Sequence, residues 1–131
     1  MRTVMLSIKP EYLQRILNGT KEYEFRRTIP KEDVSKIVFY CTAPTRKVIA
    51  WADVLGVISA SPAKIWKRTC TSAGISAEKF FEYFDGCQCA YAYRLGNVHR
   101  YKPPKSLEDF GLTAPPQSFA YVKFGRSRSG S

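Results

Sequence analysis

The sequence predicts an α+β fold: a small, mostly antiparallel β-barrel of about six strands, decorated with two or three helices. Two observations carry this prediction. The apolar residues fall into about six short segments rich in β-branched and aromatic side chains, which is typical of strands. Most of these segments follow one another with no helical segment between them, whereas a doubly wound parallel sheet needs a helix after almost every strand.

The predicted strands differ in pattern along the chain. The stretch KIVFYCT, 36–42, is almost continuously apolar, as expected of a central strand. The longest stretch, 47–60, contains Gly56, which indicates a β-bulge or a close backbone approach. The predicted strands lie in 3–8, 18–27, 36–42, 47–60, 87–101 and 118–124.

Capping signals and apolar spacing predict the helices. The first helix begins after Pro10 and ends at Gly19, where a glycine can take up the left-handed conformation. Ser61 and Ser76 are N-cap residues for two further short helices, and Ser106 caps a short turn in a loop. The predicted helices cover 11–17, 63–70 and 77–84, and the turn covers 107–110.

The length of 131 residues suits one domain with a real core. We expect a single domain over 1–124 and a flexible basic tail over 125–131, where apolar residues run out. No apolar run is as long as a membrane span, and no signal-peptide pattern is present. The expectation is therefore a cytoplasmic protein, with a monomer favoured.

Charge is the first indication of function. Lys and Arg number 21 against 11 acidic residues, a net charge of +10, and the excess is greatest over 36–75, with six basic residues and one acidic. A small basic domain attracts polyanions, nucleic acid first, although a merely solubilising surface is the alternative. The basic residues of this middle segment include Arg46, Lys47, Lys64, Lys67 and Arg68.

The cysteines do not predict a metal site. Cys41, Cys70, Cys87 and Cys89 form no C-x-x-C pair, and His99 is the only histidine. A C-x-C half-site at Cys87 and Cys89 is conceivable, but we expect reduced thiols, no metal and no cofactor.

The opening stretch MLSIKPEYLQRILNGTKEYEFRR resembles the start of an ASCH domain, a PUA-like β-barrel family. The family's pattern is a strand, a helix and then Gly-x-Lys-x-x-x-x-Arg, which here falls on Gly19, Lys21 and Arg26. The resemblance runs from about residue 3 to about residue 124 and implies a barrel with a cleft beside the Gly-x-Lys strand. The later segments that carry it are FYCTAPTRKVIAWADV, SPAKIW, ISAEKFFEYFDG, YKPPKSLEDFGL and PPQSFAYV.

The resemblance implies several activities rather than one. Some members resemble RNA-binding or transcription-associated modules, and some small bacterial members hydrolyse N4-acetylcytidine with a Lys, a Thr and a Glu. Lys21 matches that lysine, whereas Glu24 stands where those hydrolases have Thr, and Ala73 lies near the position of their Glu.

Other members are described as ribonucleases in which a Tyr, a Lys and a Ser are implicated. The loosest matches here are Tyr40, Lys47 (or Arg46) and Ser118.

Three residues of the second strand form the core of the predicted site. Lys21 is either a solvated lysine or a cleft lysine that contacts phosphate or serves as a base. Glu24 and Arg26 share one face, because strand side chains alternate with period two. Arg26 either pairs with Glu24 or holds a phosphate, and Glu24 takes a carboxylate role in catalysis or accepts from the edge of a base.

The remaining candidate ligands come from elsewhere in the chain. Tyr40 is a core residue or a stacking platform, and Arg46 and Lys47 beside it are phosphate contacts or solvated charges. The prolines before Gln117 and Ser118 stiffen that segment, so this amide and hydroxyl suit a base edge or small polar ligand, or simply begin the last strand.

Two functions remain open from the sequence. The favoured one is a nucleic-acid-binding domain that takes RNA, another single-stranded nucleic acid or a modified nucleoside in a basic cleft. The alternative is a small hydrolase acting on N4-acylated cytidine or on RNA, with Lys21 as base and Glu24 as acid or positioning group. A scaffold for an acidic protein fits the charge but has no motif to support it.

Overall fold

A six-stranded sheet forms the frame of the protein in the computed structural model, which describes residues 1–124. The order across the sheet is β2-β5-β4-β3-β1-β6, and only the β1–β3 pair is parallel among these five neighbouring pairs. The tail predicted over 125–131 lies outside the described residues. The strands are β1 (Arg2–Ile8), β2 (Tyr23–Arg26), β3 (Val34–Cys41), β4 (Lys47–Ala60), β5 (Ala90–Lys105) and β6 (Ala120–Val122).

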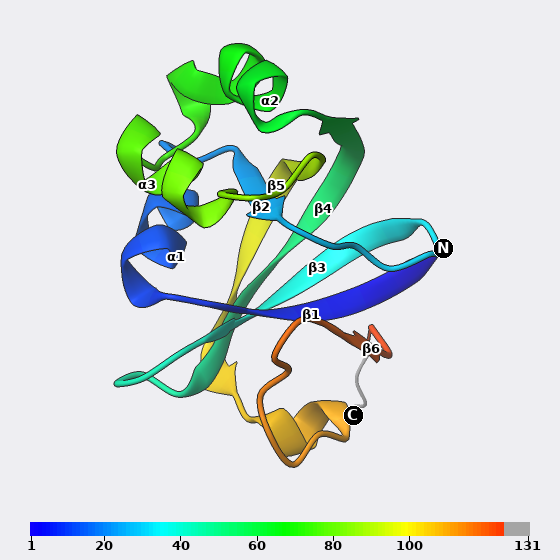
Figure 1. The fold of residues 1–131 in the computed structure, drawn as a ribbon. Coiled ribbons are helices and arrows are strands. Elements are labelled where there is room, and N and C mark those ends of the chain that lie inside the picture. The colour runs from blue at the N-terminus through cyan, green and yellow to red at the C-terminus, as the bar shows by residue number, and fades with distance from the viewer. Residues whose placement is uncertain (125–131) are drawn as a thin grey trace.

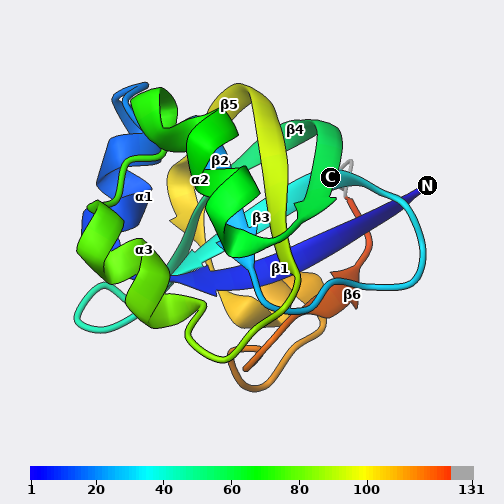
Figure 2. The same cartoon turned by 45° about the horizontal axis from the view of Figure 1, so that its top comes forward.

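The three α-helices of residues 1–124 gather at one end of the described structure, and η2 with β6 lies at the other (Figures 1 and 2). The helices are α1 (Pro10–Leu17), α2 (Pro62–Thr69) and α3 (Ala77–Tyr83), with short 3₁₀ turns η1 (Cys70–Ser72) and η2 (Leu107–Phe110). The predicted caps are confirmed, since the hydroxyls of Ser61 and Ser76 accept from the third backbone amide of α2 and α3. No helix in residues 1–124 is both long enough and apolar enough to cross a bilayer.

The predicted α+β class and the mostly antiparallel sheet are confirmed, but the closed barrel is not. Within residues 1–124 no backbone ladder joins the two edge strands, β2 and β6. These strands have only four and three residues, so they offer few backbone groups for closure. A side chain spans the gap instead: Arg26 Nη2 donates to the Ser7 carbonyl at 2.9 Å, and Nη1 to the Ser118 carbonyl at 3.5 Å.

Three apolar clusters hold these elements together. The first packs α1 on β1 and β3, with Leu13 and Ile16 buried against the sheet. The second fixes α2 and α3 to β2 and β5 around Phe80, whose ring lies 5.0 Å from that of Phe25. The third lies under η2 and β6 and includes Tyr40. The second cluster matters most for function, because it ties α3 to the strand that carries the predicted site.

The fifth strand differs from its prediction at both ends. It begins at Ala90 rather than at residue 87. It also extends past the predicted end at residue 101 to Lys105, which pairs with Val48 of β4. β2 pairs only with Tyr91–Arg94 of this strand, so Pro103 and Pro104 need no partner on that side. Gly56 lies at a register shift between β4 and β5, as the bulge prediction required.

Candidate functional site

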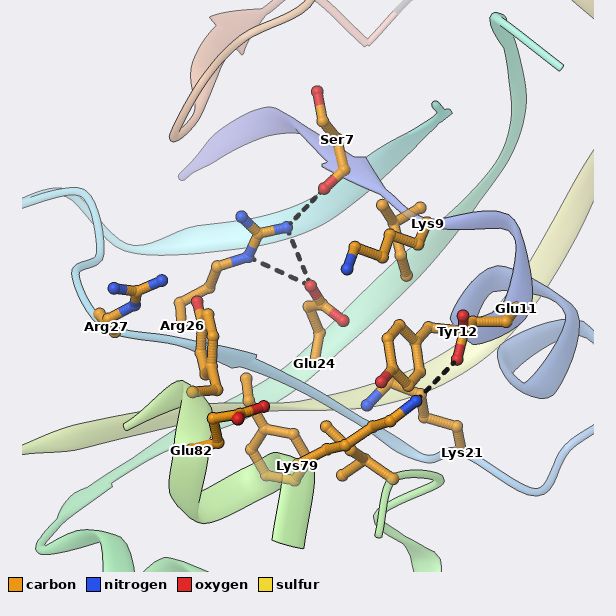
Figure 3. Close-up of a pocket in the computed structure, with 14 residues that line it drawn as sticks. Ser7, Lys9, Glu11, Tyr12, Lys21, Glu24, Arg26, Arg27, Lys79 and Glu82 are labelled. Atoms are coloured by element: carbon orange, nitrogen blue, oxygen red, sulfur yellow. Dashed lines mark hydrogen bonds and ion pairs between the residues drawn. The ribbon is translucent and has the colours of Figure 1, made fainter. Parts of the chain in front are cut away.

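A pocket of about 480 Å³ opens between β1, β2, α1 and α3 (Figure 3). This volume lies within the usual range for small-molecule sites. Its wall combines aromatic rings with both signs of charge. The lining residues are Ser7, Ile8, Lys9, Glu11, Tyr12, Lys21, Glu24, Phe25, Arg26, Arg27, Ile75, Lys79, Glu82 and Tyr83.

The connection between α1 and β2 delivers Lys21 to this pocket. Gly19 has φ +87°, the left-handed conformation predicted for it, and ends α1. The backbone amides of Thr20 and Lys21 then both donate to the Arg15 carbonyl at 3.0 Å. The chain therefore turns back tightly on the helix, and Lys21 enters the pocket just before β2.

Lys21 is buried, with 4% of its surface exposed. Its ammonium group donates to the Ala73 carbonyl at 3.0 Å and lies 4.6 Å from the centre of the Phe25 ring. Burial lowers the pKa of Lys21 from 10.5 to about 8; the Glu24 carboxylate opposes this shift, and Arg15 and Arg26 add to it. About one amine in ten is then neutral at pH 7, so Lys21 can act as a cation or as a base.

Glu24 and Arg26 form the ion pair that strand alternation predicted. Glu24 Oε2 accepts from Arg26 Nε at 3.1 Å and from Nη2 at 2.9 Å. Both side chains are largely buried, and Figure 3 shows the pair beside Ser7 at one wall of the pocket. In the described part of the chain these are the hydrogen bonds that the Glu24 carboxylate accepts, so Oε1 remains able to accept from a ligand.

The rim of the pocket is charged and exposed. Lys79 of α3 approaches Glu11 of α1, with 3.8 Å between Nζ and Oε2, so a weak ion pair spans the two helices (Figure 3). Arg27 lies over the ring of Tyr83 at 4.4 Å. Among residues 1–124, five basic and three acidic residues line the pocket, and this lining therefore carries a net positive charge.

The other predicted ligands do not line this pocket in the described part of the chain. Tyr40 is 6% exposed and packs in the third apolar cluster, although its backbone pairs with Ser7 of the pocket wall. Arg46 in the turn between β3 and β4 and Lys47 at the start of β4 are both exposed. Gln117 is exposed, and so is Ser118, which meets the site only through its carbonyl on Arg26.

Several residues of the site have no signal in the sequence. Tyr12 lies in the helix predicted over 11–17 and Tyr83 in the helix predicted over 77–84, and both line the pocket. The position expected near the hydrolases' Glu is indeed beside Lys21, but Ala73 offers a backbone carbonyl there and no carboxylate. Gly74, next to it, lies against Lys21; a single sequence gives no signal for this contact, because the two are far apart along the chain.

In the part of the chain that the structure describes, the titratable groups do not form a metal cluster. Among residues 1–124, no three His, Cys, Asp or Glu side chains are placed to hold one ion. The four cysteines are unpaired, with Cys41 buried and Cys89 exposed.

Known proteins are similar to this chain in sequence and in fold. An ASCH domain-containing ribonuclease of Zymomonas mobilis subsp. mobilis is 29% identical over 126 residues, which are 93% of this chain and 85% of that protein. The crystal structure of ASCH from Zymomonas mobilis superimposes with a TM-score of 0.84 at 28% identity, over 94% of this chain and 89% of that one. ATP synthase subunit alpha of Ureaplasma parvum serovar 3 is 31% identical over 123 residues, and there the match spans 93% of this chain but only 15% of the relative's length.

The sequence profile of the ASCH domain matches residues 6–105, which hold every residue that lines the pocket. The chain therefore belongs to the ASCH domain family.

Proposed function

We propose that the pocket binds a nucleotide of single-stranded RNA. The observation that carries this proposal is the combination of a buried carboxylate with one unoccupied oxygen, aromatic rings and a surplus of cations in one pocket of about 480 Å³. RNA as the ligand class is supported by the relative from Zymomonas mobilis, which is 29% identical to this chain and is named an ASCH domain-containing ribonuclease.

The base would lie inside the pocket. Glu24 Oε1 accepts from an exocyclic amino group, as carboxylates do with cytosine, while Lys21 still has donors beyond the one used by Ala73. The rings of Tyr12, Phe25 and Tyr83 supply apolar and stacking surface, which favours an unpaired base over a paired one.

The phosphates would follow the exposed cations. Lys9, Arg27 and Lys79 stand at the rim, where they can approach a phosphate without being desolvated. The net charge of +10 strengthens the attraction over longer distances.

Binding of a fluorescein-labelled, unstructured RNA, measured by anisotropy, tests this proposal. We expect Glu24→Gln to weaken binding about tenfold, because a lost base contact costs roughly 1–3 kcal/mol. Glu22→Gln is the matched control, since Glu22 is exposed and outside the pocket, and should bind as the unaltered protein does. Equal binding by the two variants, or binding that ignores salt, would contradict the proposal.

Ribonuclease activity is the second candidate, and the ribonuclease relative is the observation in its favour. In this reaction the neutral Lys21 amine takes the proton of a ribose 2′-hydroxyl as its oxygen attacks the adjacent phosphorus, and Glu24 orients the substrate. The bond from phosphorus to the 5′-oxygen of the next nucleotide breaks, and the Lys21 ammonium group returns the proton to that leaving oxygen. Labelled RNA and N4-acetylcytidine should be incubated with the protein, with Lys21→Met and Glu24→Gln as comparisons. Turnover that survives Lys21→Met but is lost in Tyr40→Phe or Ser118→Ala would instead indicate Tyr40, Lys47 (or Arg46) and Ser118 as the catalytic residues.

A further inference from the structure

A short covering segment, residues 72–74, lies across the Lys21 side chain. Three hydrogen bonds attach it to the surroundings of that lysine. Glu22 N donates to the Ser72 carbonyl at 2.9 Å, Lys21 Nζ to the Ala73 carbonyl at 3.0 Å, and Arg15 Nη1 to the Gly74 carbonyl at 2.9 Å. Each residue of the segment therefore accepts one hydrogen bond through its carbonyl oxygen, from Lys21 itself or from a residue that surrounds it.

Gly74 fits this segment only because it has no side chain. A Cβ at this position would overlap Lys21 Cβ and lie 2.7 Å from Lys21 Cγ, and both atoms belong to the base of the side chain, which cannot swing away. Its φ of +64° is in the left-handed region as well. Gly111 has φ +77°, but no atom of the described residues lies within 4 Å of such a Cβ, so it shares the backbone conformation without the contact.

Arg15 joins the two sides of this arrangement. Its carbonyl accepts from the backbone amide of Lys21 at 3.0 Å, and its guanidinium group donates to Gly74. One residue of α1 thus fixes both the backbone from which Lys21 starts and the segment that covers it.

We propose that Arg15 and Gly74 are positioning residues for Lys21, and that together they keep its amine buried against Ala73 and facing the pocket. The inference concerns the same pocket as the proposed function but holds for any ligand, so it can fail while RNA binding stands, and the reverse. It assigns a role to the segment between α2 and α3, which the proposed function leaves unused.

The titration of Lys21, followed by NMR of its labelled Cε in the ligand-free protein, tests Gly74. We expect Gly74→Ala to displace the lysine toward solvent and to raise the titration midpoint by at least about one pH unit, because burial is the main cause of its low value. Gly111→Ala, which carries the same backbone strain, should leave the midpoint unchanged. A folded Gly74→Ala protein with an unaltered midpoint would overturn the proposal.

Arg15→Met tests the positioning role if Gly74→Ala does not fold. Arg15→Met removes the hydrogen bond to Gly74 and also one positive charge near Lys21, so the midpoint should rise for either reason. Hydrogen exchange at the Glu22 amide separates the two, because this amide donates to Ser72 of the covering segment. Faster exchange at Glu22, by about tenfold or more, supports a positioning role, and exchange at the original rate refutes it.

Discussion

At Lys21, burial and the Glu24 carboxylate act on the pKa of one amine in opposite directions. Glu24 raises the pKa of Lys21 against the larger effect of burial. Replacing Glu24 by Gln removes the charge and keeps the shape, so we expect the pKa of Lys21 to fall below about 8. NMR titration of the lysine side chain measures this, and Glu22→Gln, on an exposed neighbour, should leave the value in place. A rise in the Glu24→Gln protein would mean that Glu24 does not face the amine.

The same lysine should make stability depend on pH. Its pKa is about 8 in the folded protein and 10.5 ordinarily, so between these values the unfolded chain binds the proton and the folded chain does not. The free energy of unfolding therefore gains up to about 3 kcal/mol from Lys21 as pH rises through this window, and this gain is absent below pH 8.

Lys21→Met isolates that contribution, because it removes the titration and leaves all other groups in place. We subtract the free energy of unfolding of the unaltered protein from that of Lys21→Met. This difference should be largest at pH 7 and should be about 3 kcal/mol lower at pH 10.5. Urea denaturation of both proteins at several pH values gives the difference. A difference that stays constant from pH 7 to 10.5 would show that burial does not perturb the lysine.

The residues of β2 could be predicted because their arrangement is local. Period-two alternation puts Glu24 and Arg26 on one face, although β2 covers only Tyr23–Arg26 of the strand predicted over 18–27. Tyr12 and Gly74 could not be predicted in the same way. Their roles depend on how α1 and the segment before α3 approach β2, and that approach is set by packing between elements distant in sequence.

Between the elements, Arg26 takes the place of a strand ladder. Its guanidinium group contacts Glu24 of its own strand, Ser7 of β1 and Ser118 before β6. Arg26→Lys keeps the charge but loses the planar set of donors, so we expect a loss of about 1–3 kcal/mol in the free energy of unfolding. Arg27→Lys is the matched control, because Arg27 is exposed and no backbone carbonyl in the described residues accepts from it. Equal stability of the two variants in urea would exclude a bridging role for Arg26.

Element boundaries followed the sequence where local chemistry decides them. Ser61 and Ser76 cap their helices as predicted, and Gly56 marks the bulge. Closure of the barrel could not be judged from such signals, since it depends on how many residues β2 and β6 contribute to pairing. The pocket lies beside the gap between β2 and β6, so the absence of closure among the described residues leaves room for the site.

Over the whole molecule, the positive charge extends well beyond the pocket. α2 has no acidic residue and exposes Lys64, Lys67 and Arg68 to solvent. Its opposite face is buried through Ile65 and Thr69. If single-stranded RNA leaves the pocket along this helix, these cations neutralise phosphates and bound counterions are released. The affinity for RNA should then fall steeply with salt concentration.

Replacing Lys64, Lys67 and Arg68 together by Gln should reduce that dependence on salt. The slope of log K against log salt should become shallower by up to about two, since each phosphate contact on a single strand contributes about 0.7. Glu24→Gln should lower affinity with the slope unchanged, because a carboxylate contacts no phosphate. A variant with Lys102 and Lys105 replaced by Gln, at the far end of β5 from α2, is the control for net charge. If it flattens the slope as much per charge removed as the α2 variant does, the RNA follows no defined path over α2, and the attraction comes from the total charge alone.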